Sequence, residues 1–299
     1  MPSTFRSTPA GRATSTSSTT PTAGLSRIQH TTKGKRVTEP VPVAATNGVI
    51  TTDPPGGPGR PPAASAAPGS VWTQGPDVEV SALRERVHEL PRTTALIDAH
   101  TRIRDRNATR QDFTTHSRRI FRLLLESAIG LLPAAPQSVL TPPGHVFEGL
   151  KVTGAVCAVA VVRAGEAFES ELWAVAPGMR VGKILIQRDR ASKQPQVYYS
   201  HLPPDLEGQH VLLLEPMLAT GGSLLAALEV LAEAGVPSSR VICVNVLCSR
   251  QGLDRVLDLH RELRIVTSSV EPALDADAFM VPGIGDFGDR YFGTDEMRS

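Results

Sequence analysis

The sequence lacks most of the features that assign a chain to a class of protein at first sight. Its 299 residues carry a formal net charge of +1, which favours neither a nucleic-acid surface nor a funnel for acidic substrates. No apolar run reaches the roughly 20 residues that a membrane-spanning helix needs. No repeat with a period of roughly 20 to 50 residues is visible, which argues against a solenoid. We therefore expect no nucleic-acid partner and no membrane partner.

Cysteine is scarce. The three cysteines, Cys157, Cys243 and Cys248, lie in or beside apolar runs and form no CxxC pair. Such a placement is typical of buried thiols in a reducing compartment rather than of a redox or zinc site. We expect three free thiols and a cytoplasmic protein.

Residues 1–75 have few residues that could form a core. They hold 11 of the 25 prolines and, before Trp72, a single aromatic residue, Phe5. Such a segment buries too little apolar surface to offset its chain entropy, so we predict a disordered tail. Its first 36 residues carry six basic residues and no acid, a bias found in organelle transit peptides and also in ordinary solvated tails. We place the folded domain at residues 80–299.

Periodic patterns begin near residue 80. They predict short helices over 80–89 and 94–104 and a stronger helix over 110–132, which ends at Pro133 and packs on the core or on a second subunit. Strands are predicted at 155–162, 180–187, 210–214, 240–247 and 265–268, with helices at 223–234 and 253–262. Residues 196–199 are predicted as one arm of a β-hairpin, with its turn at 192–195. The alternation predicts an α/β fold with a mainly parallel twisted sheet flanked by helices.

Ligands of open parallel sheets bind beyond the carboxyl ends of the strands. Thr220-Gly221-Gly222-Ser223 follows a predicted strand and opens a helix, so backbone N–H groups, two hydroxyls and the helix N-terminus can hold a phosphate there. An ordinary serine-capped helix explains this segment nearly as well.

Glu215 is the second feature at this strand end. A carboxylate just before a phosphate cradle is unfavourable unless the ligand also presents hydroxyl groups, as a ribose ring does. The pair therefore indicates a phosphorylated sugar, against the alternative that Glu215 is a surface residue beside a helix.

These residues lie within EPMLATGGS, which resembles the phosphoribosyl diphosphate (PRPP) motif of uracil phosphoribosyltransferases. Other segments are similar to that family in the same order, over roughly residues 85 to 295: IRDRNATRQDF, VRAGE, GKILIQRD, YYSHLP and VPGIGDFGDRYFGT. The resemblance implies a type I phosphoribosyltransferase fold with N-terminal helices and a β-hairpin arm, and the transfer of phosphoribosyl from PRPP to N1 of uracil, giving UMP and diphosphate.

The resemblance also implies roles for individual residues. Arg163 and Arg188 match family arginines that contact PRPP, where a guanidinium can clamp diphosphate oxygens, and Asp286 matches an aspartate near PRPP and the base. These three are the expected catalytic residues. The implied PRPP-binding residues are Arg163, Arg188, Glu215, Pro216, Met217, Leu218, Ala219, Thr220, Gly221, Gly222, Ser223 and Asp286.

The segment VPGIGDFGDR matches the family's uracil loop, and the implied uracil-binding residues are Met280, Gly285, Asp286 and Phe287. Backbone N–H and C=O groups of this glycine-rich loop can form hydrogen bonds with the acceptor–donor–acceptor edge of uracil, which cytosine does not present. Asp289 and Arg290 are candidates for catalysis or for an ion pair that holds the loop.

The implied cofactor is Mg²⁺, held mainly through PRPP, so we expect no cluster of protein metal ligands. The hairpin near residues 189–200 is expected to cover the site or to reach a partner, because such an arm accompanies dimerisation in this family. A homodimer or homotetramer is expected, and GTP is a candidate effector.

The sequence departs from the family at three places. Glu215 stands where the family has aspartate, Ser249-Arg250 where similar sequences often have Ala-Pro, and His201 where lysine is common. Glu215 and the long tail leave open a catalytically weak regulatory module that binds PRPP or UMP. A nucleic-acid-binding regulator on the same fold is a third interpretation, which the near-neutral net charge disfavours.

Overall fold

The computed structural model describes residues 85–188 and 194–294, all within the second of the two units into which the chain divides, Gly69–Ser299. The disordered tail predicted for residues 1–75 lies outside the described residues, as do residues 192–193 of the hairpin turn expected at 192–195, whose last residue, Pro195, begins β6.

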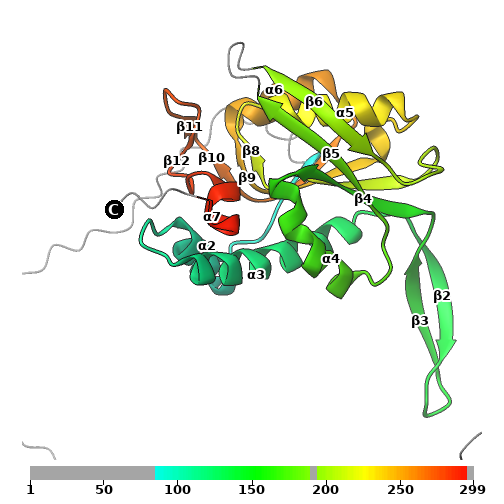
Figure 1. Cartoon of the computed structure of the whole chain (residues 1–299). Coiled ribbons are helices and arrows are strands. Elements are labelled where there is room, and N and C mark those ends of the chain that lie inside the picture. Colours follow the sequence, from blue (N-terminus) through cyan, green and yellow to red (C-terminus); the bar gives the residue numbers. More distant parts are fainter. Residues whose placement is uncertain (1–84, 189–193, 295–299) are drawn as a thin grey trace, which may run out of the picture. The chain divides into compact units, whose positions relative to one another are not determined.

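A mainly parallel sheet forms the centre of this unit (Figure 1). Its strand order is β1-β10-β9-β7-β4-β5-β6, with β8 paired to β9, and only the β5–β6 pair is antiparallel. The strands are β1 (Val87–Glu89), β4 (Val156–Val162), β5 (Val181–Arg188), β6 (Pro195–His201), β7 (His210–Leu214), β8 (Met217–Leu218), β9 (Val241–Ser249) and β10 (Arg264–Glu271). The prediction of a mainly parallel α/β fold is confirmed.

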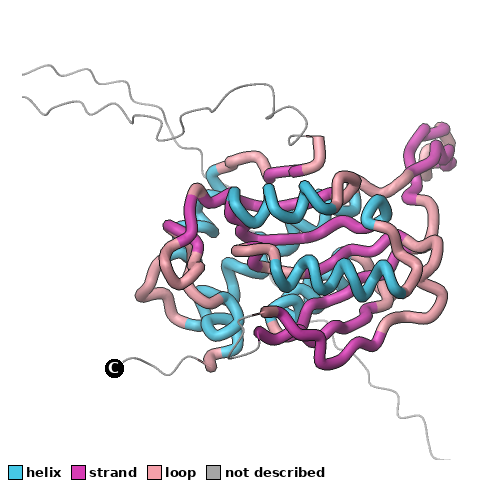
Figure 2. The backbone as a smooth tube through the Cα atoms, turned by 90° about the horizontal axis from the view of Figure 1, so that it is seen from above, coloured by secondary structure: helices cyan, strands magenta, loops and turns pink. Residues whose placement is uncertain are grey.

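Helices cover both faces of the sheet, as Figures 1 and 2 show. Side chains alternate along a strand, so Ala158 and Ala160 of β4 join one apolar core while Cys157 and Val159 join the other. The helices of the first core are α2 (Thr94–Arg104), α3 (Arg110–Ile129), α4 (Glu169–Val175) and α7 (Phe287–Phe292), and those of the second are α5 (Gly222–Glu233) and α6 (Arg250–Leu259).

The helix predicted over residues 110–132 is α3, and it packs on the core. Thr109 caps its N-terminus by accepting a hydrogen bond from the backbone N–H of Asp112. Its buried face carries Phe113, Ile120 and Phe121, whereas Leu123 is 44% exposed.

The helix predicted over residues 80–89 is wrong in its described part. Val87–Glu89 form the edge strand β1, which pairs in parallel with Ile265–Thr267 of β10. Three residues with only partial burial carry too little periodicity to reveal a strand, and pairing with β10 decides their conformation.

The hairpin predicted around residues 196–199 is confirmed as β5–β6, in which Lys183 lies opposite His201. A second hairpin, β2 (Ala134–Leu140) with β3 (Val146–Val152), was not predicted. It projects from the body of the unit as a two-stranded ribbon (Figure 1). A shorter hairpin, β11 (Ala273–Leu274) with β12 (Met280–Val281), lies close to the site described below.

The prediction of three free, buried cysteines is confirmed. Burial raises the pKa of Cys157 to about 11 and the pKa of Cys248 to about 12, so neither thiol is a nucleophile near neutral pH. Within the described ranges, no helix combines the length and apolar character that crossing a membrane requires.

Candidate active site

A pocket of about 590 Å³ opens at the carboxyl ends of β4, β5 and β7, where the parallel sheet predicts a ligand site. Segments far apart in the sequence meet there. The predicted site residues that line it are Arg163, Glu215, Met217, Leu218, Ala219, Thr220, Gly221, Gly222, Ser223, Met280, Gly285, Asp286 and Phe287.

Two predicted site residues have other positions. Pro216 is buried, and its carbonyl accepts hydrogen bonds from the backbone N–H groups of Val246 (2.9 Å) and Leu247 (3.1 Å). Pro216 thereby fixes the loop to β9. Arg188 is the last residue of β5, opposite Pro195, and its side chain is outside the described part of the structure.

The phosphate loop, residues 219–223, turns from β8 into helix α5. Gly221 takes a left-handed conformation (φ 81°), and a Cβ atom at this position would approach Val256 Cγ2 to 2.8 Å. Only glycine fits both the angle and this close contact. The turn sets the N-terminus of α5, with its unpaired N–H groups, at the pocket wall.

Helix α6 holds the other side of the phosphate loop. Ser249 Oγ donates to the carbonyl of Ala219 (2.5 Å) and accepts from the N–H of Gly252, while Arg255 Nη1 donates to the carbonyl of Thr220 (3.0 Å). In a trans peptide the N–H points opposite to the C=O. The N–H groups of Thr220 and Gly221 therefore point away from α6, and the side of the loop that lines the pocket presents donors for an anion.

Glu215 lies between β7 and the phosphate loop and is 8% exposed. Its backbone is fixed by two neighbouring strands, because Asn245 Nδ2 donates to its carbonyl (3.0 Å) and Asn245 Oδ1 accepts from Thr267 (3.0 Å). The carboxylate belongs to the pocket wall rather than to the open surface, which supports a ligand-binding role over that of a surface residue.

Arg163 follows β4 directly and lines the pocket. Its guanidinium donates to Thr294 Oγ1 (2.7 Å) and to Asp289 Oδ1 (2.5 Å), and it lies over the ring of Phe292. Hydrogen bonds from Thr294 and Arg163 lower the pKa of Asp289, which is therefore an anion that orients Arg163 near neutral pH.

The base loop, residues 282–286, links β12 to α7. Gly285 and Asp286 are its exposed, pocket-lining part, while Phe287 is buried against the rings of Phe113 and Phe121. Asp286 caps α7 by accepting from the N–H of Asp289 (2.9 Å). The loop is thus attached to the aromatic core on its C-terminal side.

Asp289 and Arg290 hold the loop through different partners. Asp289 forms its ion pair with Arg163, whereas Arg290 donates to the backbone carbonyls of Ile103, Ile284 and Asp105. Arg290 therefore has a structural role, and Asp289 connects the base loop to the arginine of the phosphate side.

Sequence reasoning missed part of the pocket. Asp277, Ala278 and Phe279, between β11 and β12, line its rim, as do Leu185 and Gln187 of β5. The left-handed conformation of Ala278 (φ 64°) has no sequence signal, because such turns normally carry glycine or asparagine. Ser249 did stand out as a departure from the family, but its partner Ala219 is not apparent from the sequence.

The parallel sheet, the glycine loop at the head of α5 with a carboxylate before it, and the arginine after β4 together define a phosphoribosyltransferase of the type I class. Comparison with known proteins narrows this class. The protein-family model for uracil phosphoribosyltransferase matches residues 90–294. The chain belongs to the uracil phosphoribosyltransferase family.

Individual relatives agree with this assignment. Uracil phosphoribosyltransferase of Saccharomyces cerevisiae is 44% identical over 208 residues, which are 70% of this chain and 96% of that protein. Uridine/cytidine kinase UKL1, chloroplastic, of Arabidopsis thaliana is 40% identical over 210 residues, but these cover only 43% of it. Among solved structures, the AQ2163 protein from Aquifex aeolicus is 27% identical with a TM-score of 0.61, covering 70% of this chain and 99% of that one.

Proposed function

We propose that this chain transfers phosphoribosyl from PRPP to N1 of uracil, giving UMP and diphosphate, in pyrimidine salvage. The observation that carries the proposal is that the phosphate loop and the base loop, about 60 residues apart in sequence, line one pocket together with Arg163, which is paired with Asp289. The volume of this pocket is in the range of small-ligand sites.

Different pocket residues bind different parts of the two substrates. Backbone N–H groups and hydroxyls of residues 220–223 hold the 5′-phosphate, and the Glu215 carboxylate accepts hydrogen bonds from ribose hydroxyls. Arg163, and Arg188 from the end of β5, stabilise the leaving diphosphate. Backbone groups of Gly285 to Phe287 bind the edge of uracil, where the amino group of cytosine would leave them unpaired.

The reaction needs no covalent protein intermediate. The bond from ribose C1 to the diphosphate oxygen breaks with its electron pair going to diphosphate, the bond from C1 to uracil N1 forms, and N1 loses its proton. Charge builds on the diphosphate as the ribose becomes oxocarbenium-like, so a fixed guanidinium lowers the barrier. Holding both substrates in one pocket supplies a further part of the rate.

Mg²⁺ fits this pocket as a partner of PRPP. The described residues contain no group of three or more His, Cys, Asp or Glu side chains placed to hold a metal, whereas the carboxylates of Glu215 and Asp286 line the pocket. Mg²⁺ typically binds substrate phosphates and one or two carboxylates. When bound, it would neutralise charge on the diphosphate, and Glu215 and Asp286, two of the carboxylates that line the pocket, would be its protein ligands beside the oxygens of PRPP.

The test is turnover by the full chain with PRPP and Mg²⁺ and either uracil, cytosine or orotate. UMP formed from uracil, with no product from the other bases, is the expected result. Absence of UMP would refute the proposal, and PRPP binding by calorimetry without turnover would favour the catalytically weak binding module. Similarity to a named uracil phosphoribosyltransferase over 96% of its length favours the enzyme.

We also propose that the chain forms a homodimer or homotetramer in a reducing compartment such as the cytoplasm. The exposed β2–β3 hairpin supports the first part and the three free thiols support the second. GTP remains a candidate effector, tested by adding it to the same assay.

A further inference from the structure

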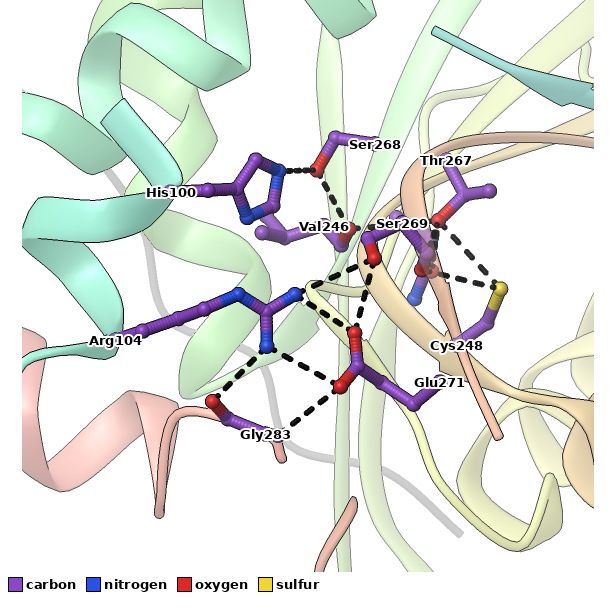
Figure 3. A network of polar contacts seen from close by, with 10 residues as sticks. His100, Arg104, Val246, Cys248, Thr267, Ser268, Ser269, Glu271 and Gly283 are labelled. Atoms are coloured by element: carbon purple, nitrogen blue, oxygen red, sulfur yellow. Dashed lines mark hydrogen bonds and ion pairs between the residues drawn. The ribbon is translucent and has the colours of Figure 1, made fainter. Parts of the chain in front are cut away.

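An ion pair outside the pocket wall lies behind the base loop (Figure 3). Glu271, the last residue of β10, has a side chain that is 2% exposed and accepts from both terminal nitrogens of Arg104, the last residue of α2, at 2.7 and 3.1 Å. Ser269 Oγ donates to the same carboxylate (2.9 Å). Burial alone would raise the pKa of Glu271, but hydrogen bonds from Arg104 and Gly283 hold it below its ordinary value. Near neutral pH this is a buried, fully charged pair.

This pair forms hydrogen bonds with both the N–H and the carbonyl group of one loop residue, Gly283. The N–H of Gly283 donates to Glu271 Oε2 (3.0 Å), and its carbonyl accepts from Arg104 Nη1 (3.1 Å). Gly283 has φ 62°, and a Cβ atom here would lie 2.0 Å from the carbonyl oxygen of Met280. The backbone at this position is therefore held by charge-assisted hydrogen bonds in a conformation that only glycine can take.

The next residue along the loop is anchored as well. Ile284 is 3% exposed, and its carbonyl accepts from Arg290 Nη1 (2.8 Å), which also bonds the carbonyl of Ile103 at the end of α2. The exposed segment that faces the pocket begins with Gly285, directly after these two anchored residues. The end of α2 thus fixes the point from which the pocket-facing backbone departs.

We propose that the Arg104–Glu271 ion pair is a positioning element for the nucleobase: it sets where the backbone of Gly285 and Asp286 meets the base, without touching the substrate. This inference rests on the proposed function for the identity of the base. Gly283 is two residues from Gly285, so a shift at the anchor displaces the base-binding backbone, and a misplacement of about 1 Å costs on the order of a hundredfold in rate. Within residues 85–188 and 194–294, neither Arg104 nor Glu271 forms a hydrogen bond with the phosphate loop, so PRPP binding should be spared.

The experiment compares Glu271→Gln with Glu171→Gln in the full-length protein. Glu171 of α4 is a matched control, because its side chain is 0% exposed and is also paired with arginines. These partners, Arg118 and Arg122, belong to α3 and are remote in sequence from the base loop. We expect Glu271→Gln to lower kcat/KM for uracil at least tenfold while the Kd for PRPP, measured by calorimetry, stays within twofold. Arg104→Lys, which keeps the charge but loses the planar fork, should give a smaller loss in the same parameter.

A second readout is independent of turnover. Hydrogen exchange of residues 280–288 in the protein without substrate should be faster in Glu271→Gln than in the wild type, and unchanged in Glu171→Gln. If the wild type forms no UMP, the proposed function fails, and the exchange data still decide the role of the anchor. Equal kinetics and equal exchange in the two glutamate variants, or equal losses for uracil and PRPP, would overturn the proposal.

Discussion

At the scale of single residues, Glu215 is the departure from the family that we expect to affect activity most. It lies in the pocket wall with its backbone held by Asn245, so its position is fixed while its side chain is one methylene longer than the family's aspartate. If the carboxylate accepts from ribose hydroxyls, removing its charge costs about 1.5 to 3 kcal/mol, the range of hydrogen bonds to charged groups.

We predict that Glu215→Gln lowers kcat/KM for PRPP about 10- to 100-fold, measured as UMP formation with saturating uracil. Glu215→Asp is the control that keeps the charge, and it should retain more activity than the glutamine variant. Equal activity of Glu215→Gln and the wild type would mean that the carboxylate does not bind the sugar.

The side chain of His100 makes the stability of the folded protein depend on pH. Burial, with a smaller contribution from the charge of Arg104, lowers the pKa of His100 to about 4, and its Nε2 lies 3.0 Å from Ser268 Oγ. The folded protein therefore holds His100 neutral down to about pH 4, whereas an unfolded chain protonates it near pH 6.5. Unfolding takes up a proton in this window, so stability falls as the pH falls through it.

The unfolding free energy of the wild type should fall between pH 7 and pH 5, and we predict that in His100→Gln this fall is smaller by about 1 to 2 kcal/mol. Urea titration at each pH measures the difference. Burial also lowers the pKa values of His88 and His210, so part of the slope should remain in the variant. His145→Gln, in the exposed turn between β2 and β3, is the control and should follow the wild-type curve. Parallel curves for His100→Gln and the wild type would contradict the prediction.

At the scale of elements, the phosphate loop depends on the start of α6. Ser249 caps that helix and bonds the carbonyl of Ala219, so Ser249→Ala leaves a carbonyl and the N–H of Gly252 without this partner. We predict about a tenfold fall in kcat/KM for PRPP, with the KM for uracil little changed.

Ser268→Ala is the matched control for this change. Ser268 is also a buried serine, and its Oγ donates to the carbonyl of Val246 (2.7 Å) within the sheet rather than to the loop. It should alter stability without altering the PRPP parameters. A similar loss of PRPP activity in both variants would show that general destabilisation, not the loop contact, is responsible.

Strands that are buried on both faces could be predicted from the sequence, whereas the edge strand β1 and the exposed strands β2 and β3 could not. The runs that form β4, β7 and β9 are continuously apolar because both of their faces are covered. Strand β1 is partly exposed at the sheet edge, and β2 and β3 pack on no core in this chain. Their sequences consequently carry no burial pattern from which a strand could be recognised.

At the scale of the whole molecule, the two halves of the site are held by neighbouring strand ends. Ser249 of β9 and Glu271 of β10 are partners in the sheet register; the first bonds the phosphate loop and the second bonds Gly283 of the base loop. The spacing between phosphate and base is therefore set by the sheet. The motif residues could be predicted from the sequence because each lies within one short segment. The contacts that hold them join positions 30 and 167 residues apart, which only the fold brings together.

Within the described residues, the β2–β3 hairpin is exposed along almost its whole length. The strand pairing places Leu140 opposite Val146 and Pro136 opposite Leu150, so these four apolar residues lie on one face, on either side of the polar pair Ser138–Glu148. Leu140 is 73% exposed and Leu150 is 76% exposed. A two-stranded ribbon with an open apolar face is marginal in water unless it packs on a partner. A second copy of the chain fits this requirement, since each copy would offer the same ribbon and the same receiving surface.

We predict that Leu150→Glu lowers the molar mass in solution towards that of a single 31.9 kDa chain at micromolar concentration, by sedimentation velocity. Lys151→Glu alters the charge on the opposite face of the same strand, beside Ala135, and should leave the mass unchanged. A monomeric wild type, or equal masses for the two variants, would show that the hairpin does not form the contact. If the mass falls while UMP formation persists, the site is complete within one chain, as expected from a pocket whose phosphate and base walls both come from this chain.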